Sequence, residues 1–389
     1  MNEIYQEKLH QAVGYLQENN IDLWLVFASE GSDPAVQLLT GLKTVGRTFF
    51  FITRQKGVFA LCSQIDAQES EESKLFDRVE RYTDDAASRL LELVEELNPA
   101  SIAINYSEDD HLCDGLTTGR YRWLCKAVGE KYAARFVPST PMLQRIRAIK
   151  TPAELSCIQT AIDMTLEIYD EVFAQMHAGM TERQVGQLFV DGMRKRNVVE
   201  GTSKELTMPI VMKDRISHRG PSDEVIVPGD FLIMDWGVDY QGYVSDIART
   251  VYFLKEGETC APQQMEESFQ AAYGAITAGF EAAKPGVRGI DVDTAARQYL
   301  LSKGMPEVTH SVGHQIGRCT HDGGTMFAPA WERYGDSPYG ILEAGMTFTL
   351  EPTILRETGY SILTEENIVI TEDGARFLSR RQDHVILIG

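Results

Sequence analysis

The sequence lacks any long apolar run: no stretch approaches the roughly 20 residues that a helix needs to span a bilayer. Its first 20 residues are polar and amphipathic, without the apolar segment of a signal peptide. We therefore expect a cytoplasmic protein that has no membrane partner.

Positive charge is also scarce, with 37 Lys and Arg residues against 57 Asp and Glu residues and a formal net charge of −20. Nucleic acids and anionic membranes bind basic surfaces, so neither is expected as the main partner. An acidic balance commonly serves solubility, and it also suits a protein that binds divalent cations.

Closely spaced cysteine pairs are absent as well. The six cysteines form no CxxC motif and are scattered along the chain, at Cys62, Cys113, Cys125, Cys157, Cys260 and Cys319. Single cysteines of this kind predict free thiols in a reducing cytosol.

The length, 389 residues, exceeds what one ordinary core holds, so two domains are expected. Residues 1–144 alternate helical and extended patterns, with an amphipathic helix at about 3–19, a strand at 22–28 and a helix at 84–97. This pattern predicts an α/β N-terminal domain, in which no dense cluster of catalytic residue types occurs.

A second domain is expected over residues 145–389, after a segment rich in proline and basic residues. Its first helix begins with the capping box of Thr151 and Glu154, and the next begins with Thr181 and Gln184. Strand-like sequence fills 206–254, and the order of two helices followed by strands then repeats to the end of the chain. This order hints at a duplicated, two-lobed domain.

Two aspartates stand in an otherwise apolar hairpin, FLIMDWGVDYQGYVSDIARTVYF (231–253). If Asp235 and Asp246 oppose each other, the turn is centred on 240–241 and their Cβ atoms lie about 4.5–5.5 Å apart. Tyr-Gln is not a favoured two-residue turn, so this register is a hypothesis. Half-buried like charges need a shared proton or a cation. Alternatively, one aspartate is a turn or capping residue and the other faces water.

Histidines concentrate in VTHSVGHQIGRCTHDGG (308–324), which holds His310, His314 and His321, three of the chain's eight. The glycines of this segment allow sharp turns and a close approach of the backbone to a ligand. A lone histidine is usually structural, but three in this setting favour a functional loop.

Acids also occur on two later strands. Glu351 lies on the polar face of the alternating segment GMTFTLEP (345–352), which Pro352 ends. The adjacent Glu365 and Glu366 must point to opposite faces of their strand. One of them can therefore face a site while the other faces solvent or supports the site from behind.

The inward candidates together are four carboxylates and one imidazole: Asp235, Asp246, His314, Glu351 and Glu365. This hard, oxygen-rich set suits manganese, cobalt, zinc or iron in a carboxylate-bridged pair. Five side chains cannot fill two separate coordination spheres, so some carboxylates must bridge. Two ions about 3.5–4 Å apart would acidify a bridging water and polarise a carbonyl.

The motif order MDWG, SDIART, SVGHQIG, TLEP and TEENIVIT resembles the pita-bread metallopeptidases, which include methionine aminopeptidase, aminopeptidase P, prolidase and creatinase. The family's ligands match Asp235, Asp246, His314, Glu351 and Glu365, with Thr371 six residues after the last ligand. The resemblance is dense over 145–389 and implies an α+β fold, with a catalytic pita-bread (creatinase/aminopeptidase) domain there. The preceding residues resemble the creatinase-like N-terminal α/β domain in size and element order.

The resemblance further implies a dinuclear hydrolase that cleaves a peptide bond, Xaa-Pro in the proline-directed branch, by a metal-bridging hydroxide, with two divalent ions of which manganese is expected. Glu351 would be the general base and proton shuttle, and His218 and His321 would stabilise the tetrahedral centre. His310 and His321 match histidines typical of the proline-directed branch.

Two departures from the family leave the substrate open. Leu363 stands where proline-directed enzymes usually carry Arg, and the segment 322–340 differs from the short family linker. A creatinase-like hydrolase of a non-peptide C–N bond or small amide is the alternative, followed by an inactive binding homologue. We expect a homodimer, in which the N-terminal domain serves dimerisation or narrows the mouth of the neighbouring subunit's site.

Overall fold

The computed structural model describes residues 2–214 and 219–389. The chain divides into two compact units, Met1–Arg147 and Ala148–Gly389. The boundary expected after residue 144 falls within helix α6 (Thr140–Ala148), which forms in the proline-rich segment with Pro141 in its first turn. That boundary therefore stays a prediction.

Unit 1 is built on one mixed six-stranded sheet in the order β4-β3-β2-β1-β5-β6. Its strands are β1 (Leu23–Ala28), β2 (Thr48–Thr53), β3 (Val58–Ser63), β4 (Arg78–Tyr82), β5 (Ile102–Ile104) and β6 (Phe136–Pro138). Its helices before α6 are α1 (Asn2–Glu18), α2 (Pro34–Leu39), α3 (Ala67–Ser73), α4 (Ala86–Leu97) and α5 (Thr118–Ala133).

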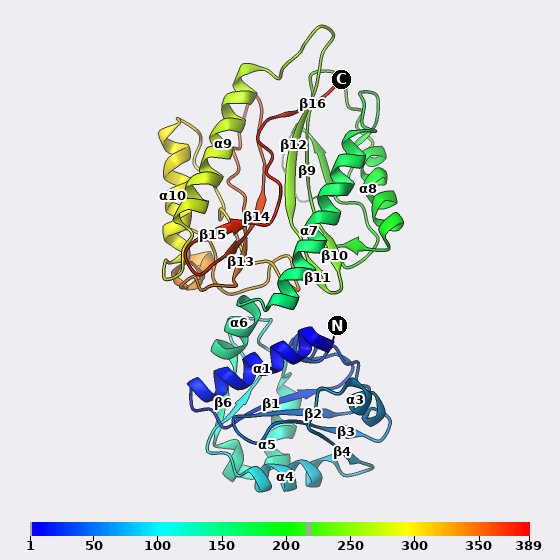
Figure 1. Ribbon diagram of the computed structural model, residues 1–389, viewed down its shortest axis with the longest axis vertical. Helices are drawn as coiled ribbons and strands as arrows, with labels where there is room; N and C mark the ends of the chain where they lie inside the picture. Colours follow the sequence, from blue (N-terminus) through cyan, green and yellow to red (C-terminus); the bar gives the residue numbers. More distant parts are fainter. Residues whose placement is uncertain (1, 215–218) are drawn as a thin grey trace. The chain divides into compact units, whose positions relative to one another are not determined.

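Helices cover both faces of this sheet. Along β1, Leu25 and Phe27 pack with α4 and α5, whereas Trp24 and Val26 pack with α1 on the opposite face. Figure 1 shows α1 and α3 on one side of the strands and α4 and α5 on the other. Because both faces are buried along β1, its sequence LWLVFA is apolar throughout and does not alternate.

Unit 2 contains four helices and three small sheets within the described residues. The helices are α7 (Pro152–Phe173), α8 (Glu182–Arg196), α9 (Gln263–Ala282) and α10 (Gly289–Ser302), and the short 3₁₀ helices are η1 (Glu332–Tyr334) and η2 (Ser337–Tyr339). The strands are β7 (Val199–Glu200), β8 (Ile210–Lys213), β9 (Phe231–Trp236), β10 (Val238–Tyr240), β11 (Tyr243–Val244), β12 (Ile247–Phe253), β13 (Thr347–Leu350), β14 (Glu366–Ile370), β15 (Ala375–Phe377) and β16 (Ile386–Ile388).

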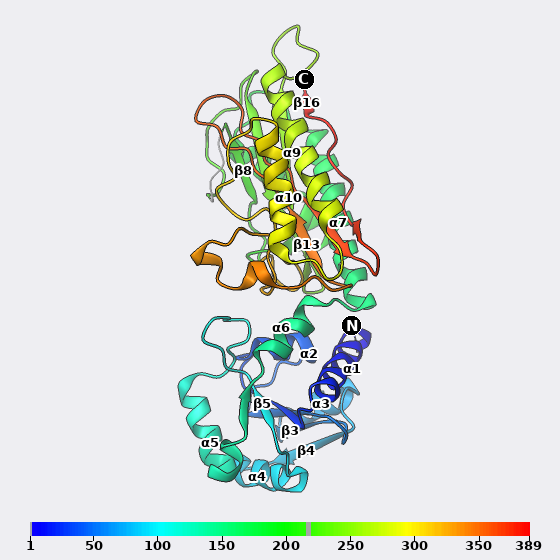
Figure 2. The same cartoon turned by 90° about the vertical axis from the view of Figure 1, so that its left-hand side faces the viewer.

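The two helix pairs flank the strands of unit 2, α7 with α8 on one side and α9 with α10 on the other (Figures 1 and 2). The sheet orders are β16-β12-β9-β8, β11-β10-β7 and β13-β14-β15. Both expected capping boxes are confirmed, at Thr151 with Glu154 and at Thr181 with Gln184. The order of two helices followed by strands occurs twice in the chain, although the last strand, β16, joins the sheet of β8, β9 and β12.

The register of the aspartate hairpin differs from the expected one. Asp235 pairs with Ala248, not with Asp246. The turn residues are Gln241 and Gly242, whose φ angles of 55° and 83° are both positive, as a two-residue type I′ turn requires. The correction moves the partner by two residues. Because side chains alternate with a period of two, it leaves both aspartates on the same face.

In the part of the chain that the structure describes, no helix is both long and apolar enough to cross a membrane.

Candidate metal centre

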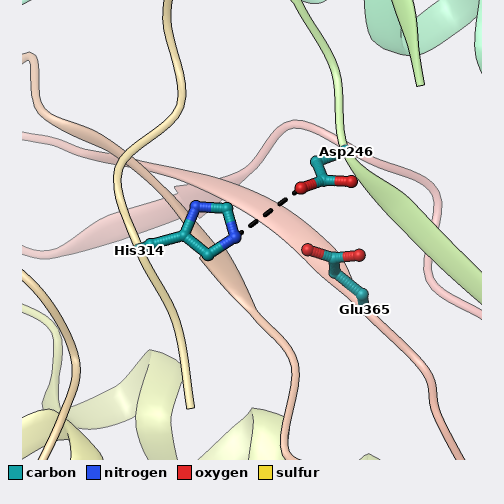
Figure 3. A group of neighbouring side chains, drawn as sticks. All are labelled: Asp246, His314 and Glu365. Carbon is teal, nitrogen blue, oxygen red and sulfur yellow. Dashed lines mark ion pairs between the residues drawn. The ribbon is translucent and has the colours of Figure 1, made fainter. Parts of the chain in front are cut away.

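Three side chains from separate segments converge in unit 2. Asp246 lies between β11 and β12, His314 lies on the loop after α10, and Glu365 directly precedes β14. All three are buried, and a ligand atom of each lies within 4.8 Å of the others (Figure 3). The ion pair drawn there joins His314 Nε2 to Asp246 Oδ2 at 3.6 Å.

The two other predicted ligands lie in the same region. Glu351 follows β13 directly, and its Oε1 is 3.4 Å from His314 Nε2. Asp235, in β9, is close enough for its charge to raise the pKa of Asp246, Glu351 and Glu365. The structure therefore brings together all five residues that the motifs singled out.

Burial and mutual repulsion disfavour the charged forms of these acids. Burial, followed by the charge of Asp235, raises the pKa of Glu351 to about 8. Burial and the neighbouring acids raise the pKa values of Asp246 and Glu365 well above their ordinary ranges. Burial lowers the pKa of His314 to about 3, so its imidazole is neutral and cannot compensate them.

The donor set fits a divalent cation. Glu365 Oε1 is fully buried and has no hydrogen-bond partner among the residues described. The Arg249 guanidinium lowers the pKa of Glu365 only as the last of five influences, and it forms its own ion pair with Glu366 at 3.2 Å. Buried carboxylates require a positive partner, and a neutral imidazole beside carboxylates is a common ligand set for such an ion.

Backbone contacts explain how the candidate ligands are held. The Tyr169 hydroxyl of α7 lies 3.0 Å from the carbonyl oxygen of Met234 and 2.8 Å from that of Ile247. These two residues are direct neighbours of Asp235 and Asp246, so α7 fixes both strands of the hairpin next to the acids.

The loop ligand is fixed by β13. The His314 N–H donates to Thr349 Oγ1 at 3.1 Å, and the Thr349 N–H donates to the His314 carbonyl at 2.9 Å. Sequence reasoning missed both Thr349 and Tyr169. The alternation of GMTFTLEP, which places Thr349 on the face of Glu351, was the available signal for the threonine.

The additional histidines differ in their placement. The exposed His321 ring lies 4.4 Å from the His314 ring, centroid to centroid, at 45°. His310 is half-buried, its Nδ1 lies 2.6 Å from the Ser311 carbonyl oxygen, and burial lowers its pKa. His218 lies outside the described residues.

A buried ion pair supports the histidine loop. Lys150 Nζ lies 3.1 Å from Asp322 Oδ2, with the side chains 1% and 2% exposed. A Cβ at Gly317 would lie 2.2 Å from the same oxygen, so only glycine permits this approach. Lys150 belongs to the basic run before α7, where the sequence carries no sign of such a role.

The structure shows the surroundings of Leu363 and of the segment 322–340, the two places where the sequence departs from the family pattern. Leu363 is 5% exposed and belongs to the apolar core of unit 2, so its position contributes no charge to the site. In the segment 322–340, the Trp331 ring is contacted by two guanidinium groups, those of Arg297 and Arg333, whose carbons lie 5.4 and 4.6 Å from its centroid. The Tyr334 hydroxyl accepts a hydrogen bond from the Ser311 N–H at 2.9 Å, which ties this segment to the histidine loop.

The sequence profile described as metallopeptidase family M24 matches residues 156–372. Among curated relatives, an Xaa-Pro dipeptidase of Pyrococcus horikoshii is 24% identical over 386 residues, which cover 99% of this chain and 100% of that protein. An uncharacterized peptidase of Bacillus subtilis, YqhT, is 27% identical over 277 residues, which cover 71% of this chain and 73% of the relative.

Solved structures share the fold over the whole chain. An X-Pro aminopeptidase from Thermotoga maritima has a TM-score of 0.75 at 24% identity, covering 98% of this chain and 99% of its own. An Xaa-Pro dipeptidase from Bacillus anthracis has a TM-score of 0.77 at 22% identity, with 98% and 99% covered. These matches confirm the expected pita-bread fold with its N-terminal domain. The chain belongs to metallopeptidase family M24.

Proposed function

We propose that this metallopeptidase is a dinuclear enzyme that cleaves Xaa-Pro peptide bonds. The observation that carries the proposal is the buried cluster of Asp246, His314 and Glu365, with Glu351 in contact with the histidine. The names of the relatives support the substrate class, since an Xaa-Pro dipeptidase aligns over 99% of this chain.

Five residues would hold the two ions: Asp235, Asp246, His314, Glu351 and Glu365. We propose manganese as the native metal, because hard carboxylate ligands predominate in the set; cobalt, zinc and iron also fit it. When bound, such ions acidify a water molecule and polarise the scissile carbonyl.

The chain's own residues supply the proton transfers and the donors. We assign the roles of general base and proton shuttle to Glu351, whose carboxylate lies at the cluster with Oε1 3.4 Å from His314 Nε2. The exposed His321 ring lies 4.4 Å from that of His314, and we assign to it the donation to the developing oxyanion. We assign the same task to His218 and a substrate-positioning role to His310.

The experiment uses protein stripped with EDTA and then supplied with manganese. We expect hydrolysis of Xaa-Pro dipeptides or of longer Xaa-Pro peptides only after metal addition, and no metal-dependent turnover in Asp246→Asn. The exposed Asp191→Asn is the matched control and should retain full activity. Full activity in Asp246→Asn, or in the stripped wild type, would contradict the proposal.

A creatinase-like activity on a non-peptide C–N bond is the second candidate. The apolar burial of Leu363, where proline-directed enzymes usually carry Arg, favours keeping it. Creatine and small cyclic amides in the same metal-supplemented assay separate the two candidates, because only one class of substrate should be turned over. A chain that binds no metal and hydrolyses none of them would be the inactive binding homologue.

We also propose that the enzyme is a cytoplasmic homodimer. Light scattering across a range of protein concentrations measures the assembly directly. A monomer with full peptidase activity would remove any role of a neighbouring subunit in limiting substrate length.

A further inference from the structure

Two of the proposed ligands lie on segments that run side by side. Asp246 immediately precedes β12, and Glu365 immediately precedes β14. The Glu365 N–H donates to the Ala248 carbonyl at 3.2 Å, and the Thr250 hydroxyl donates to the Leu363 carbonyl at 2.6 Å. The two segments meet across the site, so contacts between them decide how far apart the two carboxylates lie.

Asn367 forms two hydrogen bonds with the main chain of Asp246. Its side-chain amide donates from Nδ2 to the Asp246 carbonyl at 2.5 Å and accepts the Asp246 N–H at Oδ1 at 3.3 Å. Asp246 lies beyond the pairs of the β9–β12 ladder, which end at Ile247. The amide therefore takes the place that a neighbouring strand would occupy, giving both main-chain groups of Asp246 a partner.

The arrangement is reciprocal. Arg249, three residues after Asp246, donates from its guanidinium to the Glu365 carbonyl at 2.8 Å. Its charge is met by Glu366 at 3.2 Å, so Arg249 holds the Glu365 backbone while its ion pair lies outside the ligand set. Asn367, two residues after Glu365, thus holds the main chain of Asp246. Arg249, three residues after Asp246, holds the main chain of Glu365.

Asn367 is itself rigidly placed. It is fully buried, pairs with Thr349 in the β13–β14 ladder, and its N–H donates to Ser379 Oγ at 3.0 Å. Only an amide supplies a donor and an acceptor side by side without charge. An aspartate there would lose the donor and add a fifth carboxylate to Asp235, Asp246, Glu351 and Glu365.

The same strand offers a matched comparison. Gln382 clamps Thr250 in the same two directions: its Nε2 donates to the Thr250 carbonyl at 2.8 Å, and its Oε1 accepts the Thr250 N–H at 3.3 Å. Gln382 is 6% exposed, and Thr250 lies four residues beyond Asp246 on β12. This clamp holds the strand and touches no proposed ligand.

We propose that Asn367 is a positioning residue of the metal centre, which fixes the main chain of Asp246 and thereby sets metal affinity. The inference rests on the proposed function, since it takes Asp246 as a ligand. Groups that orient metal ligands typically change affinity by about 10–100-fold when removed. The Gln382 clamp should instead contribute only to stability.

The test is isothermal titration of the EDTA-treated full-length protein with manganese. Asn367→Ala removes the amide and leaves a gap, whereas Asn367→Leu removes it and fills the space. Gln382→Ala and Gln382→Met are the corresponding variants at the control position. We expect all four variants to lower the thermal midpoint, and only the Asn367 variants to raise the Kd for manganese by about 10–100-fold.

Each other outcome decides against the inference. Unchanged manganese affinity in a folded Asn367 variant, or an equal loss in the Gln382 variants, would overturn it. So would failure of both Asn367 variants to fold while the Gln382 variants fold, because the role would then be structural. Failure of the proposed function is distinguishable, since the wild-type protein itself would then bind no manganese.

Discussion

Replacing Asp246 by Asn should change the stability of the metal-free and metal-supplied protein in opposite directions. After burial, the charge of Asp246 is the largest influence that raises the pKa of Glu365. An acid whose pKa is raised on folding loses stability as the pH rises above its ordinary value. Asn has nearly the same size without the charge, so the stripped variant should be more stable than the stripped wild type at pH 8.

The size of this stability gain follows from how strongly burial and the neighbouring acids disfavour the charged forms in the cluster. The pKa of Glu351 in the same cluster is about 8 against an ordinary 4.5, and one pKa unit corresponds to about 1.4 kcal/mol. Full ionisation of such a group therefore costs several kcal/mol. Asp246 is one of three acids that raise the pKa of Glu365, a buried carboxyl of the same cluster, so its removal should raise the free energy of unfolding by about 1–2 kcal/mol.

With metal the sign reverses. A ligand present at 100 times its Kd stabilises the folded state by about 2.7 kcal/mol. For a unit the size of residues 148–389, this corresponds to a rise of roughly 5–10 °C in the midpoint of the wild type. Asp246→Asn should lose most of this rise, because a proposed ligand is missing.

Thermal unfolding of EDTA-treated protein at pH 8, with and without manganese, measures both effects. The exposed Asp191→Asn serves as the control and should behave as the wild type in both conditions. The reasoning is refuted if Asp246→Asn is less stable than wild type without metal, or if manganese raises its midpoint as much as that of wild type.

The remaining predictions concern a buried acid of α8, the tyrosine that holds the hairpin, and the hairpin itself. Burial would raise the pKa of Glu182, but hydrogen bonds led by that from Arg219 lower it to about 2, so the stability Glu182 contributes is lost as the pH falls from 4.5 toward 2. Glu182→Gln should therefore cost roughly 1.5–3 kcal/mol at pH 7 in denaturant unfolding and much less at pH 3; a difference independent of pH would contradict this. Tyr169→Phe, which removes a hydroxyl bound to two hairpin carbonyls, should cost about 1 kcal/mol by the same measurement, and no loss would show those carbonyls to be satisfied otherwise. Manganese should slow amide exchange in the hairpin 231–253, and exchange there that ignores the metal would count against its aspartates as ligands.

Local patterns in the sequence anticipated much of the fold. The two capping boxes and the spacing of apolar residues located the long helices of unit 2, because caps and helical periodicity are local properties. The alternation of GMTFTLEP placed Glu351 on the same face as Thr349. Thr349 in turn accepts a hydrogen bond from the His314 N–H. Motif order indicated all five proposed ligands, which the structure then brought into one region.

Long-range pairing decided the rest. The hairpin register depends on the Gln241–Gly242 turn, and the expected register was wrong by two residues, because several turns near Gly242 satisfy the same alternation. The strand pattern showed that Glu365 and Glu366 face opposite ways, but only the partner segments show that Glu366 meets Arg249 and that Glu365 faces the site.

The sequence by itself determined which residue types lie on which face of each element, and its motif order indicated the proposed ligand set and the family. Only the tertiary structure decided which residues hold those ligands. A helix cap or an alternating strand is encoded within a few neighbouring positions. The Asn367 clamp on Asp246 joins residues 121 positions apart, and its geometry exists only when β12 and β14 lie side by side.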